Sequence, residues 1–497
     1  WSYWQDLNWV GGEFPSAMPN FTKGFFEFSL LLGGKDGAVL FAKWYQPSSL
    51  VLLGFCSWLF FRSLRFSPPV CLLGALALVL NGDLFSYTAW GLASVALGAA
   101  GAFMAMAGVI NGLRETGWRM VAWVVLGGLG LGQGVMESFD VGGIFSLYVA
   151  VFVIAAALNR EGVGKKKWPP ALAKGAGMLV LVVLASTLMS WHTLHNLLRT
   201  EGGAAISNKV GTEEQVNQLE QTVAQQLAEV QAHPQFSPAQ KLEISGRMLD
   251  EKNRLVEMIR NQPFDVATQW SVPPIESLRM VIPGLYGYRE SPHGWMPHPV
   301  DGEQQYWGCV GQTPGFTRIQ DEYPVFAEAM AHFQKTYGGG PMLRHASSGI
   351  YMGLMVLVVA LWGLLQACRG EAGAFDLYER RWIFFWALLA LMSLVLAWGH
   401  HAPFYKLIYQ LPFFNVIRNP IKFMHPCSMA MVILFTYGLQ GLAREYLVEL
   451  KQAKDVLEQF KLWLGTLKGW DRKWAFGMLA MAVTGILSWL FYAALQT

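Results

Sequence analysis

Apolar residues gather in ten stretches along the 497-residue chain, each close to the roughly 20 residues that a helix needs to cross a bilayer. The stretches lie near residues 41–61, 68–86, 90–112, 119–136, 142–158, 170–192, 348–367, 381–398, 426–443 and 474–494. The stretch at 119–136 is rich in glycine, which favours the close approach of a neighbouring helix. The pattern predicts an all-α polytopic membrane protein with about ten transmembrane helices.

A polar insertion at residues 193–347 interrupts these stretches. Its first part, 213–231, repeats valine and leucine at nearly helical spacing. A break at His233–Pro234 and a helix-start signal at Ser237-Pro238 follow. The insertion is therefore expected to contain a helical hairpin within 205–261. Residues 270–320 are rich in proline, glycine and aromatic residues, which predicts an ordered loop lying over the helix bundle.

The composition agrees with a protein that lies in a lipid bilayer. Hydrophobic residues make up 53% of the chain and charged residues only 14%, whereas soluble domains carry about 25% charged residues. The 21 tryptophans are typical of membrane–water interfaces. A net charge of +3 is too small to indicate a nucleic-acid partner. The five cysteines form no C-x-x-C pair, which argues against a cysteine zinc site or a disulfide scaffold.

Lysine and arginine recur in alternate loops between the predicted spans. These residues are Arg62, Arg65, Arg114, Arg119, Arg160, Lys165, Lys166, Lys167, Arg369, Arg380, Arg381, Arg444, Lys451, Lys454, Lys461, Lys468, Arg472 and Lys473. The short loops 81–89 and 137–141 contain acidic residues and neither lysine nor arginine. Because basic loops stay in the cytoplasm, the alternation predicts an orientation as well as a span count.

This orientation divides the chain into four regions. Residues 1–40 are expected to form an outer amphipathic loop, 41–192 an N-terminal transmembrane bundle and 193–347 an extracytoplasmic insertion. The region 348–497 is expected to form a C-terminal bundle, with an outer loop at 399–425 and a cytoplasmic loop at 444–473. An outward N-terminal stretch also leads us to expect a further span before Trp1.

Several carboxylates lie on the predicted outer side. Asp83, Glu137 and Asp140 stand at outer helix ends, and Asp6 and Glu13 belong to the N-terminal stretch. Glu137 and Asp140 would share one helical face if their turn is helical. Such groups could converge on a cleft that holds a divalent cation or supplies a general base. The alternative is a set of solvated helix caps.

Two cations lie on the same predicted side, four residues apart. Arg418 and Lys422 bracket an Asn-Pro pair just before a span, where positive charge is less expected. Either could bind a phosphate, and the alternative is contact with lipid headgroups. His192, His195, His400 and His401 lie at outer helix ends too, and ordinary polar ends explain them better than a metal site does.

Three segments carry a resemblance to a known group. They are "DLNWVGGEFPSAMPN" with the span that follows it, "ESLRMVIPGLYGYRESP", and "LPFFNVIRNPIKFMHP" before a span. Together with the order of the spans, they make the chain resemble the YfhO-like bacterial membrane proteins, within the GT-C class of glycosyltransferases. The helices at 205–261 look like an insertion into this pattern.

The resemblance implies an enzyme of the bacterial cytoplasmic membrane that takes a sugar from a polyprenyl-phosphate carrier. Transfer to a cell-envelope acceptor would occur on the outer face. By position, Asp6 or Glu13 would be the catalytic carboxylate, and Arg418 with Lys422 would hold the carrier phosphate. A cavity lined by these groups and by Tyr286 and Tyr288 is expected.

Two other functions are compatible with the sequence. A non-catalytic membrane subunit could dock protein partners through the hairpin at 205–261, whose apolar stripe is the supporting feature. A transporter would need ionisable residues within the spans or broken helices. The predicted spans are nearly free of charge, so this alternative ranks last.

Overall fold

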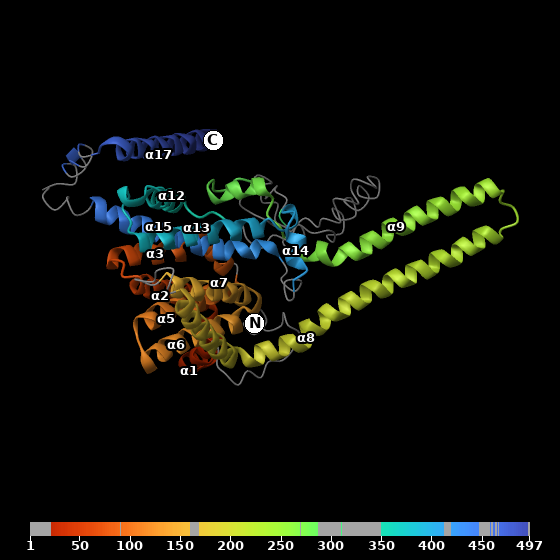
Figure 1. Ribbon diagram of the computed structural model, residues 1–497, viewed down its shortest axis with the longest axis horizontal. Helices are drawn as coiled ribbons and strands as arrows, with labels where there is room; N and C mark the ends of the chain where they lie inside the picture. Colours follow the sequence, from red (N-terminus) through yellow and green to blue (C-terminus); the bar gives the residue numbers. More distant parts are fainter. Residues whose placement is uncertain are drawn as a thin grey trace.

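The computed structural model describes residues 21–89, 91–159, 168–268, 270–286, 310, 349–411, 419–446, 458, 461–462, 465 and 467–495. This part of the chain folds into helices joined by turns, with no strand among the residues just given (Figure 1). The helices are α1 (Phe21–Gly33), η3 (Gly34–Asp36), α2 (Gly37–Ser63), α3 (Pro68–Val79), α4 (Gly82–Ala89), α5 (Ala93–Arg114), α6 (Gly117–Glu137), α7 (Phe139–Leu158), α8 (Trp168–Ala232), α9 (Pro238–Thr268), η5 (Pro274–Met280), α12 (Leu354–Cys368), η7 (Gly370–Ala372), α13 (Leu377–Ala397), η8 (Gly399–His401), α14 (Tyr405–Tyr409), η10 (Pro420–Phe423), α15 (Met424–Tyr446) and α17 (Gly469–Leu495).

The protein is a multi-pass membrane protein. Among the described residues, six helices are long and apolar enough to cross a membrane, and a bent pair raises this number to seven. The six are α5, α6, α7, the first part of α8, α13 and η10 with α15. Helices α2, α12 and α17 cover three more of the predicted stretches, although α12 has only 15 residues. The count of ten spans stays a prediction.

The predicted span at 68–86 is two helices rather than one. Helices α3 and α4 meet at an angle of 52° around Leu80 and Asn81. The N–H of Gly82 donates to the carbonyl of Tyr351 (3.0 Å), so a distant segment supplies a backbone partner at the break. A Cβ on Gly82 would lie 2.4 Å from that carbonyl oxygen, which explains the glycine.

Two packed groups of helices form the bundle. Helices α2, α5, α6, α7 and the first part of α8 form one group, and α3, α12, α13 and α15 form the other (Figure 1). A buried hydrogen bond between Tyr148 and Ser393 (2.7 Å) joins them. The glycine-rich α6 lies so close to α5 that a Cβ on Gly101 would meet the carbonyl of Gly130 at 2.5 Å. The expected close approach at 119–136 is therefore confirmed.

The predicted hairpin is present. Helices α8 and α9 leave the bundle together and turn back at 233–237 (Figure 1). Ser237 and Gln240 cap the start of α9 reciprocally, with N–O distances of 2.9 and 3.3 Å, which confirms the helix-start signal. The expected boundary at 193 does not interrupt the helix, because α8 runs from the bundle into the hairpin with a kink at Ser190.

Hydrogen bonds and ion pairs bring the basic loops to one end of the bundle. Five contacts link the helix ends there: Asn111 to Ser63, Ser67 to Gln440, Asn159 to Tyr378, Arg444 to Glu379, and Arg369 to Asp471. The breaks between α3 and α4 and between α6 and α7 lie at the other end, from which the hairpin leaves (Figure 1). The described helix ends that flank the predicted basic loops therefore lie together at one end of the bundle.

The described part of the predicted surface loop packs onto this second end. The carbonyl of Trp270 accepts from Ile421 N–H (3.0 Å), and Val272 N–H donates to Ala397 (2.9 Å). Helix η5 buries the ion pair between Glu276 and Arg279. Residues 270–286 are thus ordered over the bundle, as expected. Most of the remaining loop lies outside the described residues.

Candidate functional site

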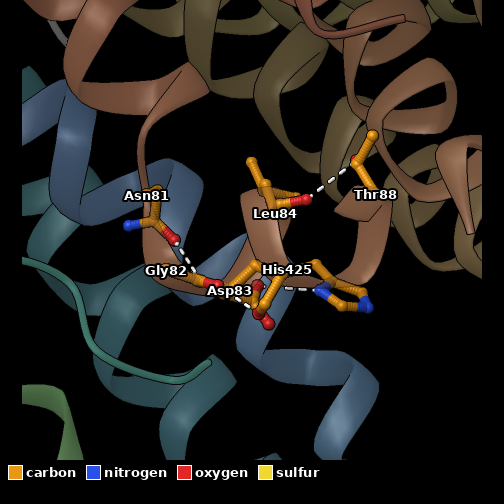
Figure 2. A network of polar contacts seen from close by, with 7 residues as sticks. Asn81, Gly82, Asp83, Leu84, Thr88 and His425 are labelled. Atoms are coloured by element: carbon orange, nitrogen blue, oxygen red, sulfur yellow. Dashed lines mark hydrogen bonds and ion pairs between the residues drawn. The ribbon is translucent and has the colours of Figure 1, made fainter. Parts of the chain in front are cut away.

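A buried carboxylate and a buried imidazole meet across the break between α3 and α4. Oδ2 of Asp83 lies 2.8 Å from Nδ1 of His425, and each side chain is 1% exposed. Asn81 holds Asp83 in place, because its Oδ1 accepts the Asp83 N–H (3.0 Å; Figure 2). The rings of Tyr87 and His425 pack nearly perpendicular to each other, with 4.8 Å between centroids. The interpretation of Asp83 as a solvated cap is therefore wrong.

Several polar atoms around this pair have no partner. Asp83 Oδ1, His425 Nε2, Asn81 Nδ2 and Ser428 Oγ are buried, and none makes a hydrogen bond within the part of the chain that the structure describes. An unsatisfied buried polar group costs about 1–3 kcal/mol. Such groups are rare in native proteins, and they gather where a ligand, an ion or a water belongs.

A second ion pair lies beside the first. Lys422 Nζ donates to Asp140 Oδ2, and the side chains are 15% and 36% exposed, so this pair is open to the surface. Asp140 Oδ1 accepts the N–H of Val141 (2.7 Å) in the first turn of α7. His425 is close enough to Asp140 to act on its charge. We refer to Asp83, Asp140, Lys422 and His425 as the junction cluster.

The two cluster residues on the C-terminal side belong to one short stretch. Lys422 and His425 are three residues apart where η10 continues into α15, so they lie about one helical turn from each other. Lys422 is partly exposed and His425 is buried. The cluster therefore has an outer cation and an inner imidazole.

Glu137 does not join the junction cluster. Ser138 has non-helical dihedral angles (φ −146°, ψ 91°), so α6 ends before α7 begins and Glu137 and Asp140 do not share a helical face. The Glu137 carboxylate accepts the Thr22 N–H (2.9 Å) and the Thr22 hydroxyl instead. It therefore caps the start of α1, where a negative charge is stabilising. The condition for a common face, a helical turn from Glu137 to Asp140, is therefore not met.

An apolar cavity of about 240 Å³ lies between α12, α13 and α15. Its lining includes Met280 of η5, Leu361, Leu391, Cys427 and Leu434. Leu361 and Leu391 are 49% and 56% exposed, so the cavity opens on the surface of the bundle. Cys427 is two residues from His425, which places one end of the cavity near the junction cluster.

The other predicted site residues fall into two groups. Asp6, Glu13, Arg418 and Tyr288 lie outside the described residues. Tyr286 ends the described part of the surface loop with a φ of 72°, and it packs against the core of the bundle. The cavity expected around these residues together stays a prediction.

The junction cluster fits acid–base chemistry and anion binding better than metal binding. No group of three or more His, Cys, Asp or Glu side chains that could hold a metal occurs among the described residues. Both carboxylates of the cluster already pair with a base, Asp83 with His425 and Asp140 with Lys422. These donors therefore do not fit a divalent cation.

His425 was missed by the sequence analysis. It stands in "KFMHPCS", at the start of a span, where an ionisable side chain within an apolar helix is a functional signal. The partner of His425, Asp83, lies 342 residues away, so the sequence did not show the pair. Comparisons with family models, with curated proteins and with solved structures each find no match to this chain.

Proposed function

We propose that the protein is a membrane glycosyltransferase that takes a sugar from a polyprenyl-phosphate carrier. The transfer would reach a cell-envelope acceptor on the outer face of the bacterial cytoplasmic membrane, as the GT-C resemblance implies. The observation that carries the proposal is Lys422. This cation lies at the end of the bundle opposite the basic loops, in a partly exposed pair with Asp140.

A phosphate can replace Asp140 as the partner of Lys422. The ammonium is a mobile point charge, and the phosphate gains negative charge as the sugar-linked diester becomes the released monoester, which then carries more charge than one carboxylate does. Lys422 would then stabilise the phosphate as it leaves the sugar, which is the electrostatic part of such a transfer. We keep Arg418, four residues earlier, as a second phosphate ligand in this proposal.

The cavity between α12, α13 and α15 supports a lipid carrier. Its wall is apolar, it opens at the bundle surface, and Cys427 brings one end near the junction cluster. A branched prenyl chain needs such a groove, whereas a water-soluble nucleotide sugar does not. The carrier's phosphate at Lys422 and its chain in the cavity would account for both features with one ligand.

The N-terminal carboxylates keep their proposed role on the acceptor side. Glu137 holds Thr22 next to the α6–α7 break, three residues from Asp140. Glu13 is eight residues before Phe21, whose helix begins beside the α6–α7 break. Asp6 and Glu13 therefore stay candidates in the proposal.

The proposal is tested with purified protein in vesicles of bacterial lipid extract, which supplies envelope acceptors. Polyprenyl-phosphate-linked glucose, galactose, mannose and N-acetylglucosamine are offered as radiolabelled donors. We expect transfer from at least one donor and binding of farnesyl phosphate in detergent. Lys422→Met should reduce both by at least about 10-fold, since a charge-assisted contact contributes about 1.5–3 kcal/mol.

Lys406→Met is the matched control. Lys406 lies on α14 at the same end of the bundle, where its ammonium packs over the Phe264 ring at 5.7 Å from the centroid. The Lys406→Met protein should transfer sugar and bind farnesyl phosphate like the wild type. Equal binding by wild type and Lys422→Met, together with no transfer from any donor, would overturn the proposal.

A second candidate function is a membrane subunit that docks partners through the hairpin. It is favoured by the way α8 and α9 extend away from the bundle as one paired unit (Figure 1). Their pairing is fixed by Lys241 Nζ to the Gln231 carbonyl (2.6 Å) and by Arg260 to Glu213 (3.5 Å). Replacing 205–261 with a short flexible linker should abolish stoichiometric partner copurification and leave farnesyl phosphate binding intact.

A further inference from the structure

We infer that His425 is the general base of the proposed transfer and that Asp83 positions it. The inference rests on the proposed function and deepens it. It assigns the base to a residue of α15 rather than to the N-terminal carboxylates. Four observations carry it: the contact with Asp83, the unpartnered Nε2, the exclusion of water and the one-turn distance from Lys422.

The contact with Asp83 selects the tautomer. A carboxylate 2.8 Å from Nδ1 accepts a hydrogen bond from that nitrogen, so the ring proton stays on Nδ1. Nε2 then carries the free lone pair. This arrangement, a carboxylate behind an imidazole with the far nitrogen open, is the one that activates hydroxyl nucleophiles in many enzymes.

The far nitrogen needs a partner that the described chain does not supply. His425 Nε2 is buried and makes no hydrogen bond with any described residue. A hydroxyl of the acceptor would satisfy it at the moment when the base is needed. Because the imidazole is shielded from water, the proton it takes cannot leak to solvent, and electrostatic interactions around it are strong.

Lys422 and His425 lie at different depths in the site. Lys422 is the outer, partly exposed group, and His425 lies about one turn further in. A phosphate held by Lys422 would therefore lie about one helical turn from the base, so that the carrier phosphate and the base belong to one site.

The step can be written with its atoms balanced. The acceptor oxygen attacks C1 of the sugar while its proton moves to His425 Nε2. The bond between C1 and the phosphate oxygen breaks, and its electron pair leaves with the phosphate, which Lys422 holds. His425 becomes an imidazolium whose charge is stabilised by Asp83, and it passes the proton to the released phosphate.

The test uses His425→Asn in the full-length protein. The asparagine amide can still donate to Asp83, but nothing replaces Nε2. We expect transfer to fall by at least about 100-fold, because general base catalysis contributes about 100-fold to 10,000-fold. Farnesyl phosphate binding should stay within twofold of the wild type. His400→Asn is the control: His400 lies at the same end, with its Nδ1 3.0 Å from the Thr268 carbonyl, and should keep full transfer.

The result that overturns the inference is full transfer by His425→Asn. A second measurement does not depend on transfer. In protein labelled with ¹⁵N-histidine, His425 should show a protonated Nδ1 and an unprotonated Nε2 at pH 7, and Asp83→Asn should change this tautomer. An imidazolium at pH 7 would also overturn the inference. If the wild type binds farnesyl phosphate but transfers no sugar, the proposed function fails. The tautomer measurement still tests the role of Asp83 and His425 in that case, because it does not depend on transfer.

The pH profile distinguishes a base from a structural histidine. The wild type should lose transfer at low pH, because a general base must be unprotonated to accept a proton, and the residual activity of His425→Asn should lack this loss. Other ionisable groups lie around the imidazole and are held constant in this comparison: Asp83 and Tyr87 of α4, Asp140 of α7 and Lys422 of η10.

Discussion

Two acid–base pairs at opposite ends of the bundle, Arg444 with Glu379 and Asp83 with His425, differ in how many of their polar atoms are hydrogen-bonded. At the basic end, Arg444 binds both oxygens of Glu379 at 2.7 and 2.8 Å, and Glu379 also forms a capping box with Asp376. At the other end, Asp83 and His425 share one contact. Each of these two leaves a buried polar atom unpaired among the described residues.

The two pairs differ in whether all their polar atoms have hydrogen-bond partners, and not in the distance between the charged groups. Arg444 is 47% exposed, so water completes its hydrogen bonds, and the bidentate geometry uses both carboxylate oxygens. The Asp83–His425 pair is desolvated on both sides, and its attraction must offset that cost. A pair that only joined α4 to α15 would be expected to satisfy all its atoms. The unpaired atoms of Asp83 and His425, together with the depth at which they are buried, support the proposed site.

The largest effect is expected from breaking the desolvated pair. Asp83→Ala leaves His425 buried without its partner, and the free energy of unfolding should fall by about 3–5 kcal/mol. The double variant Asp83→Leu with His425→Leu should recover most of this loss, because an apolar pair needs no desolvation. Unfolding in detergent, followed by circular dichroism, measures both.

The double variant also tests whether the Asp83–His425 pair serves transfer rather than stability. It should be folded and bind farnesyl phosphate, yet transfer no sugar. If the double variant were as unstable as Asp83→Ala, the pair would be stabilising in itself, and the contrast with Arg444 and Glu379 would disappear.

Much of the architecture could be predicted from the sequence, because it depends on local patterns. The apolar periods locate α5, α6 and α7, and Ser237-Pro238 locates the start of α9. The pairing of side chains could not be predicted. Asp83 meets a residue 342 positions away, and Glu137 meets Thr22, 115 positions away. Such contacts depend on how the helices pack against one another. A single sequence carries little information about that packing.

Local breaks in the helices also prevented the prediction of side-chain positions from the sequence. One non-helical residue, Ser138, sends Glu137 towards α1 and Asp140 towards η10. The break between α3 and α4 has the same effect, because it lets Asp83 turn into the bundle instead of capping a helix at its surface. Interruptions of this kind lie at the candidate site and decide which side chains meet there.

A smaller effect is expected at Glu137, which is buried at the same end but satisfied. Glu137→Ala removes the cap from Thr22, so α1 should lose about 2 kcal/mol of local stability. Trypsin cleavage after Lys23 in the first turn of α1 measures this opening and should become faster. Glu27→Ala is the control, since its exposed pair with Lys23 (3.8 Å) contributes little. Unchanged cleavage of Glu137→Ala would mean that α1 is held by its aromatic packing on α2 alone.

The smallest effect is expected at the basic end. Arg444→Met removes both hydrogen bonds to Glu379, but the guanidinium is half exposed and Glu379 keeps its capping box with Asp376. The free energy of unfolding should fall by about 1 kcal/mol or less, and transfer and farnesyl phosphate binding should be unchanged. The same detergent unfolding measures this loss. A drop in transfer without a drop in stability would contradict the comparison, because a satisfied pair at the far end of the bundle would then act on the chemistry. The expected result, a small loss of stability at full activity, is the reverse of that expected for the double leucine variant.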